Sequence, residues 1–273
     1  MSKNWLCLEN KIVIVTGGAS GIGKAIAQEF LNQGANVVVC DLSINVPKFN
    51  MEENSGEMLY VNMDVTNKES IVAAFNKGKE KFGKLDILIN NAGINIPSLL
   101  IDHKQEDSKY ELNEVIYDKV MNINVKGVYL CSQIAGREML KQGEGVIINI
   151  SSECGLEGSE GQSIYAASKN AVNSFTRSWA KELGKKGIRI LGIAPGIIEV
   201  TGLRTLEYEE ALSYTRGITI EDLRRGYTNT STIPIGREGK LTEIANVVCF
   251  LASEKAGYVH GITVNVSGGK TRG

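Results

Sequence analysis

The chain has 273 residues, with 30 glycines but only 4 prolines, and its 30 basic side chains nearly balance its 31 acidic ones. This composition excludes a collagen-like chain, which needs glycine at every third position and abundant proline. An apolar content of 42% excludes a disordered chain, and a net charge of -1 creates no field that would attract nucleic acid or an anionic membrane. We therefore expect a globular protein that uses glycine at special backbone positions.

The five cysteines are scattered along the chain, and neither their spacing nor the two histidines fit a zinc site. Such a pattern is typical of reduced thiols in a cytoplasmic protein. Residues 1–10 lack the apolar centre of a signal peptide, and no apolar run approaches the ~18 residues that a membrane span needs. We therefore expect a cytoplasmic protein with no bound metal and no nucleic-acid or membrane partner.

In chain order, short apolar runs alternate with longer amphipathic segments. The runs predict strands at residues 12–15, 37–40, 59–61, 85–89, 146–150, 188–193 and 262–266. The amphipathic segments predict helices at residues 22–32, 68–82, 112–141, 164–183 and 242–252. Because the runs are apolar throughout, both faces of each strand should be buried. The pattern predicts an α/β fold: one doubly wound, Rossmann-type domain over residues 1–273, with a seven-stranded parallel sheet and helices on both faces.

One long segment, residues 197–240, contains no predicted strand. It carries two predicted helices, at residues 207–214 and 219–225. Long insertions after a strand often form lids or binding loops, and ligands in such sheets lie at the carboxyl ends of the strands. We therefore expect a substrate lid here; a surface insertion without a role in binding is the alternative.

The sequence TGGASGIG, residues 16–23, follows the first strand directly and opens the first helix. Its glycine spacing allows a tight turn, close approach of a pyrophosphate, and close packing of the helix on the strand. The helix start adds free N–H groups and a positive dipole end. A purely structural turn is the alternative, but the strand–turn–helix context favours a nucleotide. The expected contacts are Gly17, Ser20, Gly21, Ile22 and Gly23.

Asp41 stands at the end of the second predicted strand, 24 residues after Gly17. A spacing of ~20 residues is typical of the acidic residue that binds the ribose of a dinucleotide. A carboxylate there accepts hydrogen bonds from both ribose hydroxyls and repels a 2′-phosphate. Asp41 therefore predicts NAD rather than NADP, although an acid that only faces water would give the same sequence.

Ser152, Tyr165 and Lys169 form the third group of polar residues. Tyr165 and Lys169 are four residues apart in a predicted helix, so they share a face. A free tyrosine, with a pKa near ~10, is a poor base at neutral pH, and a nearby ammonium should lower that pKa. Tyr165 could then exchange a proton with an alcohol or carbonyl, while Ser152, at a strand end, bonds the same oxygen.

These features resemble the short-chain dehydrogenase/reductase superfamily over the whole chain. The matching residues are Thr16–Gly23, Asp64, Val65, Asn90–Gly93, Asn124, Ser152, Tyr165, Lys169, Pro195 and Gly196. The resemblance implies that Tyr165 is the catalytic acid or base, that Ser152 positions the substrate oxygen, and that Lys169 also binds the cofactor ribose. It implies that Asn124 supports a water linked to the lysine. Further cofactor contacts implied by the resemblance are Asp64, Val65, Asn91, Ala92, Gly93, Pro195, Gly196 and Ile197.

The chain departs from the superfamily pattern at one place. A threonine often stands five residues after the proline of the Pro195-Gly196 pair and binds the cofactor carboxamide. Here Val200 occupies that position and Thr201 follows it, so the contact made by the threonine is left open.

Residues 155–163, 201–210, 233–237 and 268–273 resemble a branch of the superfamily that acts on a phosphorylated sugar alcohol. This resemblance implies NAD-dependent oxidation of D-glucitol 6-phosphate to D-fructose 6-phosphate, and the superfamily resemblance implies a homotetramer. Five of the nine arginines lie between residues 204 and 237, where they suit a phosphate or merely balance nearby acids. Candidate phosphate ligands are Arg204, Lys270 and Arg272, and Glu153 is a candidate acceptor for a polyol hydroxyl.

Alternatives of three classes are another enzyme activity, an NAD-binding module and a nucleic-acid-bound regulator. The enzyme could oxidise an unphosphorylated polyol or reduce a diketone. The chain could also be an NAD-sensing module without catalysis, which the intact group of Ser152, Tyr165 and Lys169 argues against. A regulator bound to nucleic acid is disfavoured by the neutral charge and by the lack of a basic stripe.

Overall fold

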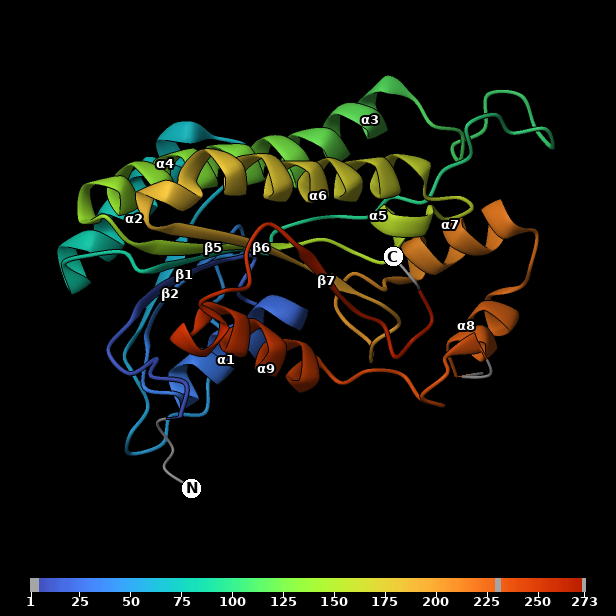
Figure 1. Cartoon of the computed structure of the whole chain (residues 1–273). Coiled ribbons are helices and arrows are strands. Elements are labelled where there is room, and N and C mark those ends of the chain that lie inside the picture. Colours follow the sequence, from blue (N-terminus) through green and yellow to red (C-terminus); the bar gives the residue numbers. More distant parts are fainter. Residues whose placement is uncertain (1–4, 229–231, 272–273) are drawn as a thin grey trace.

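Seven parallel strands form one sheet with the order β3-β2-β1-β4-β5-β6-β7 (Figure 1). The computed structural model describes residues 5–228 and 232–271. The predicted seven-stranded parallel sheet is confirmed, with strand ends within a few residues of those expected. The strands are β1 (Ile12–Thr16), β2 (Asn36–Asp41), β3 (Met58–Asn62), β4 (Ile87–Asn90), β5 (Gly145–Ile150), β6 (Ile188–Pro195) and β7 (Thr263–Val266).

The strand order reverses between β1 and β4, which pair in parallel with Val13 opposite Ile87. β2 and β3 extend the sheet to one side, and β5, β6 and β7 extend it to the other. The connections that leave the carboxyl ends of β1 and β4 therefore turn to opposite faces, which opens a crevice at that edge of the sheet. This topology confirms the doubly wound fold and places the predicted site residues at one edge.

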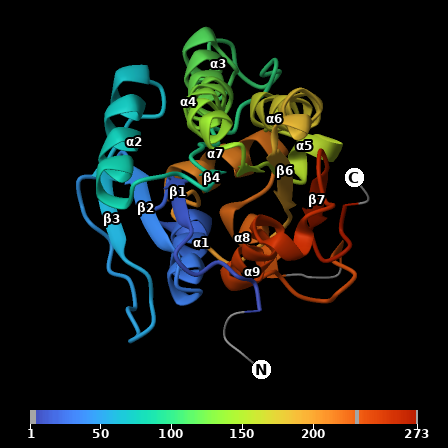
Figure 2. The same ribbon diagram turned by 60° about the vertical axis from the view of Figure 1, so that its left-hand side comes forward.

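Helices cover both faces of the sheet (Figure 2). On one face lie α1 (Gly21–Asn32) and α9 (Leu241–Ala252), and on the other lie α2 (Lys68–Phe82), α4 (Gly127–Gln142) and α6 (Ser163–Leu183). β1 shows why the inner strands are apolar throughout. Val13 and Val15 join the core under α1 and α9, whereas Ile14 joins the core under α2 and α4.

The outermost strands differ from this pattern. The β3 residues Met58, Leu59 and Tyr60 are only partly buried, and so are all the residues of β7. β7 alternates threonine and asparagine with valine, and the side-chain amide of Asn265 donates to the carbonyl of Thr271 at 2.6 Å. The expectation that every strand is buried on both faces is therefore wrong for these two, because the helix layers centre on the inner strands.

The region predicted as a single helix over residues 112–141 is interrupted. α3 spans Glu114–Met121, a π-helical turn follows over Asn122–Lys126, and α4 continues from there. A π turn inserts one residue and often marks a functional site. Here it carries Asn124, which is 1% exposed. The prediction did not locate such a turn, because it treated residues 112–141 as one continuous helical segment.

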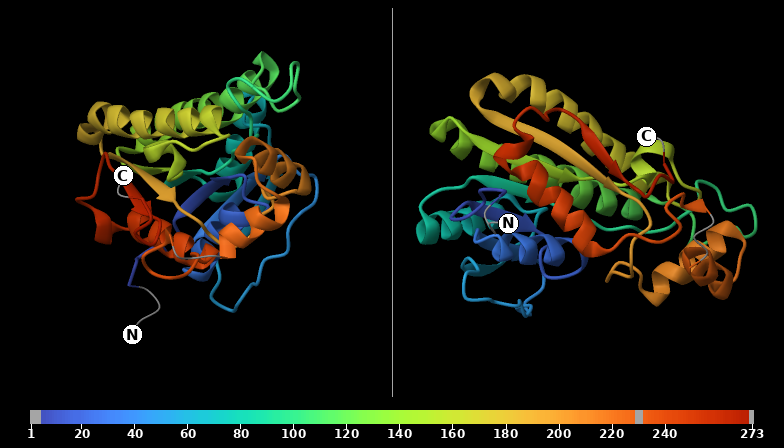
Figure 3. Two further views of the ribbon diagram at one scale, coloured as in Figure 1. Left: turned by 90° about the vertical axis from the view of Figure 1, so that its right-hand side faces the viewer. Right: turned by 60° about the horizontal axis from the view of Figure 1, so that its bottom comes forward.

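The segment 197–240 contains the two predicted helices, α7 (Leu206–Arg216) and α8 (Ile220–Thr228). Within its described residues, the only pairing of strand type is an isolated bridge between Ile198 and Gly239. Figure 3 shows α7 and α8 together at one end of the molecule. Throughout residues 5–228 and 232–271, no helix is long and apolar enough to cross a membrane.

Candidate active site

A cavity of about 680 Å³ lies at the carboxyl ends of the strands and runs from the glycine turn to α7 and α8. It brings together most of the residues selected from the sequence. Those that line it are Gly17, Ser20, Gly21, Ile22, Asp41, Asp64, Val65, Asn91, Ala92, Gly93, Ser152, Glu153, Tyr165, Lys169, Pro195, Gly196, Ile197, Arg204 and Lys270. Gly23 and Asn124 do not line it but support residues that do, and Arg272 lies outside the described residues.

The glycine turn has the backbone that its sequence predicts. Gly17 and Gly21 have φ values of 63° and 52°, a left-handed region that only glycine adopts without strain. The Asn91 side-chain amide donates to the carbonyls of Thr16 and Gly17 at 3.0 and 2.9 Å, and so fixes the turn to the end of β4. A Cβ on Gly23 would collide with the Gly17 carbonyl oxygen and with the Asn91 amide, so Gly23 accommodates the turn itself.

Asp41 is held at the end of β2 by two backbone donors. Its carboxylate accepts from Ala19 N–H at 2.9 Å and from Ser43 N–H at 3.0 Å. One carboxylate can accept about four hydrogen bonds, so Asp41 keeps acceptor capacity toward the cavity. The bond to Ala19 also joins the carboxylate to the glycine turn. The two parts of the predicted dinucleotide site therefore form one rigid unit.

Asp64 and Val65 lie beside this unit, at the carboxyl end of β3. The Asp64 carboxylate accepts from the N–H and the hydroxyl of Thr66, at 2.8 and 2.7 Å. Val65 packs against Gly127, at the start of α4, where a Cβ would stand 3.0 Å from the valine side chain. These contacts fix the loop after β3, so Asp64 and Val65 form a preformed wall of the cavity.

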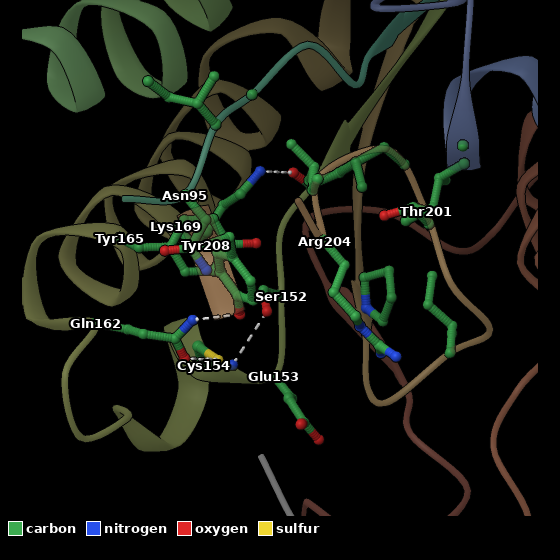
Figure 4. A pocket seen from close by; sticks show the side chains of 18 of the residues that line it. Asn95, Ser152, Glu153, Cys154, Gln162, Tyr165, Lys169, Thr201, Arg204 and Tyr208 are labelled. Atoms are coloured by element: carbon green, nitrogen blue, oxygen red, sulfur yellow. Dashed lines mark hydrogen bonds between the residues drawn. The ribbon is translucent and has the colours of Figure 1, made fainter. Parts of the chain in front are cut away.

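Ser152 follows β5, and α6 carries Tyr165 and Lys169 to the same part of the cavity (Figure 4). The Lys169 Nζ atom lies 5.8 Å from the centre of the Tyr165 ring and donates to the Ile150 carbonyl at 2.8 Å. The Ser152 hydroxyl accepts from Cys154 N–H at 3.2 Å. The serine, tyrosine and lysine thus converge from a strand end and one helix face, as the sequence predicts.

Burial controls the protonation of this group. It raises the pKa of Tyr165 well above its usual value, and hydrogen bonding with Ser152 opposes the rise. It lowers the pKa of Lys169 to about 8. The net pKa of Tyr165 in this structure therefore lies above, not below, that of a free tyrosine, because removal of the phenol from water has the larger effect. At neutral pH, Tyr165 is a protonated phenol beside a buried ammonium.

Asn124 lies behind this group, in the π turn. Its amide donates to the Ile94 carbonyl at 2.9 Å and to the Ser168 hydroxyl at 3.0 Å, and its oxygen accepts from Ile94 N–H. A Cβ on Gly93 would stand 3.2 Å from the Asn124 oxygen and 3.4 Å from Lys169 Nζ. Asn124 and Lys169 are therefore close neighbours across Gly93, in keeping with a shared hydrogen-bond path.

The C-terminal tail reaches the cavity through Glu153. The Glu153 carboxylate accepts from Lys270 Nζ at 2.5 Å and from the Thr271 hydroxyl at 2.8 Å. Thr271 is buried, and its N–H donates to Ser267 at 3.2 Å. Two residues predicted to bind substrate separately, Glu153 and Lys270, are thus paired with each other in this structure.

The structure also shows where Val200 and Thr201 lie, the two residues at which the chain departs from the superfamily pattern. Thr201 lines the cavity, and its Cβ lies 3.3 Å from the position that a Cβ on Gly21 would take. Val200 is 64% exposed and does not line the cavity. Thr201 is therefore the threonine available to a cofactor.

Several polar residues of the cavity were not selected from the sequence. Gln162 donates from its amide to the Tyr208 hydroxyl at 3.0 Å, and both residues line the cavity beside Tyr165 (Figure 4). Asn95 lines it too, with a buried amide oxygen that has no hydrogen-bond partner in the described residues. Gln162 stands three residues before Tyr165, one helical turn away, which is a signal that the sequence did offer. Tyr208 gave none, since it lies on a separate helix.

A model of the short chain dehydrogenase family matches residues 11–211, from the start of β1 into α7. The chain belongs to this family. It is therefore an oxidoreductase with the fold that the sequence predicted, and α8 and the C-terminal tail lie beyond the matched region.

Individual relatives cover almost the whole chain. The chain is 53% identical to sorbitol-6-phosphate 2-dehydrogenase from Klebsiella pneumoniae, over 98% of this chain and 99% of that protein. It is 38% identical to a 3-oxoacyl-acyl-carrier-protein reductase from Thermotoga maritima, over 96% and 98%. Among solved structures, the ligand-free aldohexose dehydrogenase of Thermoplasma acidophilum is similar with a TM-score of 0.79 at 28% identity, covering 97% of this chain and 95% of that one.

Proposed function

We propose that the protein oxidises D-sorbitol 6-phosphate to D-fructose 6-phosphate with NAD as the hydride acceptor. The observation that carries this proposal is the 53% identity to a sorbitol-6-phosphate 2-dehydrogenase. That similarity extends over 98% of the chain, so it includes α8, which the family model does not cover. Leu223 and Tyr227 of α8 line the cavity.

The residues at the glycine turn fit a dinucleotide. The turn presents backbone without side chains at Gly17 and Gly21, and the free N–H groups of α1 begin beside it. Asp41 offers carboxylate acceptors for ribose hydroxyls. The cationic residues that line the described cavity are Lys169, Arg204, Arg216 and Lys270, and none belongs to β1, α1, β2 or β3. A 2′-phosphate would therefore meet the Asp41 carboxylate without a compensating charge, which favours NAD over NADP.

The proposed mechanism uses Ser152 and Tyr165 to hold the C2 hydroxyl of the substrate. Tyr165 first releases its phenol proton toward Lys169 and Asn124, and the resulting phenolate accepts the hydroxyl proton as the C2–H bond breaks and the C2–O bond becomes a carbonyl. Bound NAD supplies the acceptor for the hydride. The Lys169 ammonium stabilises the phenolate, and Asn124 holds the far end of the proton path. In the reverse direction, the same phenol donates its proton to the ketone oxygen.

We expect Asp41→Ala to raise the KM for NAD by about 10- to 100-fold, because it removes the acceptors for the ribose and the bond that fixes Ala19. The KM for NADP should change little or fall, since the repulsive carboxylate is gone. Initial rates with each cofactor test this, and Asp41→Asn, which keeps one acceptor, should give an intermediate value. A wild-type enzyme that already prefers NADP would contradict the choice of NAD.

The proposed function is tested by NADH absorbance over a panel of sugar-alcohol phosphates with their unphosphorylated parents. D-sorbitol 6-phosphate should give the highest kcat/KM and D-sorbitol a much lower one, because the phosphate contributes binding energy. A higher kcat/KM for a free polyol or a diketone would support the corresponding alternative. An absence of turnover with all of them, while NAD still binds, would support an NAD-sensing module.

Two further features belong to this proposal. Residues 197–240 act as the substrate lid, since α7 and α8 supply one wall of the cavity. The enzyme assembles as a homotetramer, as its family resemblance implies.

A further inference from the structure

The structure divides the five arginines of segment 197–240 into two groups. Arg224 donates to Glu209 at 2.6 and 3.0 Å, Arg225 lies 3.4 Å from Asp222, and Arg237 donates to Glu243 at 2.6 and 2.7 Å. For these three, the view that the arginines balance nearby acids is correct. The other two, Arg204 and Arg216, line the cavity and have no carboxylate partner within the described residues.

The other cationic residues of the cavity are already engaged. Lys270 is paired with Glu153, and Lys169 belongs to the catalytic group. The Arg204 guanidinium lies over the Tyr227 ring, 3.7 Å from its centre. Arg204 stands two residues after Gly202, where a Cβ would stand 3.8 Å from the Ser20 hydroxyl. Its segment therefore passes beside the glycine turn, while its guanidinium is already stacked on an aromatic ring.

Arg216, the last residue of α7, lies on the side of the cavity formed by Ser159 and Gln162. Its guanidinium donates to the Ser159 hydroxyl at 3.3 Å, a long bond that leaves most of its N–H donors unused. Ser159 in turn donates to the Gln162 oxygen at 2.7 Å, and the Gln162 amide donates to Tyr208. A continuous polar chain therefore leads from Arg216 to Tyr208.

Tyr208 connects this chain to the catalytic group. Its hydroxyl accepts from Gln162, which stands three residues before Tyr165, and Tyr208, Tyr165 and Arg216 all line the cavity. Burial raises the pKa of Tyr208, which keeps its hydroxyl protonated. Figure 4 shows Tyr208 and Gln162 converging on Tyr165 and Ser152, with Arg204 on the other side. A substrate oxidised at Tyr165 thus has hydroxyl partners beside it and a free guanidinium beyond them.

We propose that Arg216 binds the phosphate of the substrate, with Ser159 orienting its guanidinium and with Gln162 and Tyr208 lining the path of the polyol chain. This assignment rests on the proposed function and names the residue that makes the enzyme specific for a phosphorylated substrate. A guanidinium suits the role because its planar fork binds two phosphate oxygens at once. The C6 phosphate lies several carbons from C2, and Arg216 is connected to Tyr208 through Ser159 and Gln162.

The experiment compares kcat/KM for D-sorbitol 6-phosphate with kcat/KM for D-sorbitol at saturating NAD. Arg216→Gln should lower the first value by about 10- to 100-fold and leave the second unchanged, so that the phosphate preference collapses. Arg216→Lys keeps the charge but loses the fork, and should retain part of the preference. Arg237→Gln is the matched control, since it removes an arginine of the same segment outside the cavity, and should keep both values.

A preference retained in Arg216→Gln would overturn the assignment, as would a preference that collapses in Lys270→Gln instead. A purely structural role, such as a cation at the C-terminus of α7, would lower both kcat/KM values together. If Arg216→Gln does not fold, Ser159→Ala tests the assignment instead. A several-fold loss of the preference for D-sorbitol 6-phosphate over D-sorbitol supports it, and an unchanged preference contradicts it. A wild-type enzyme without any phosphate preference would refute the proposed function itself.

Discussion

Tyr165→Phe is expected to lower kcat for D-sorbitol 6-phosphate by about 10²- to 10⁴-fold, the range that general acid–base catalysis contributes. The variant removes one oxygen atom and keeps the ring in place beside Lys169. Without that oxygen, the C2 hydroxyl has no acceptor for its proton, so hydride transfer would leave an unfavourable protonated carbonyl. The measurement is single-turnover NADH formation at saturating NAD and substrate.

NAD affinity should change little in the same variant, because the glycine turn and Asp41 lie apart from Tyr165. Titration of the protein with NAD, followed by intrinsic fluorescence, tests this. Tyr258→Phe is the matched control: it makes the same chemical change at a fully exposed position that does not line the cavity, and should keep wild-type kcat. Wild-type turnover by Tyr165→Phe would remove the tyrosine from its assigned role.

The fold was predictable because its signals are local and repeated. The inner strands are apolar at every position, a pattern that requires cover on both faces and therefore a parallel sheet between helix layers. Successive residues of β1, such as Val13 and Ile14, indeed enter opposite cores. The expectation of burial on both faces failed for β3 and β7, which are the edge strands of the sheet. The sequence of a strand does not show whether that strand lies at an edge.

The candidate site was predictable to the same extent. The glycine turn, Asp41 and the Tyr165–Lys169 pair each carry a spacing that follows from one helix or one strand–turn–helix unit. Interactions between distant segments carry no such spacing. The Lys270–Glu153 pair joins residues 117 positions apart, and the sequence pattern of neither segment predicts it.

The lid arginines show the same limit in more detail. The sequence around Arg224 does not distinguish it from Arg216, since each arginine comes after acidic residues in or next to a predicted helix. Only the packing of α8 against α7 shows that Arg224 meets the buried carboxylate of Glu209, whereas Arg216 turns toward Ser159. The sequence therefore indicated an arginine-rich lid, and the structure was needed to separate the arginines with acidic partners from those that face the cavity.

Burial of Lys169 should have a cost in stability that varies with pH. Its pKa is lowered from 10.5 to about 8 in the folded protein, because the buried ammonium loses its hydration. Below pH 8 the lysine is charged in both the folded and unfolded states, and the whole penalty is present. Between about pH 8 and 10.5 the folded protein loses its proton before the unfolded chain does, so the free energy of unfolding rises with pH. Above 10.5 the penalty is gone.

Lys169→Met removes this titration while retaining an unbranched side chain. We therefore expect the free energy of unfolding of the wild type, minus that of Lys169→Met, to rise between pH 7 and 10.5. The total rise should be on the order of 3 kcal/mol, since one pKa unit corresponds to about 1.4 kcal/mol. Urea denaturation of both proteins without cofactor, at intervals across this range, gives the difference directly.

The difference isolates Lys169 from the other buried groups. Burial also raises the pKa of the thiols of Cys40, Cys131 and Cys249, which should lower the stability of both proteins alike as pH rises above about 9. Lys181→Met, at an exposed position on the same helix, is the control and should follow the wild type at every pH. A constant difference between Lys169→Met and the wild type would show that Lys169 has an ordinary pKa. The Lys169 ammonium would then retain enough hydration in the folded protein to keep the pKa of an exposed lysine.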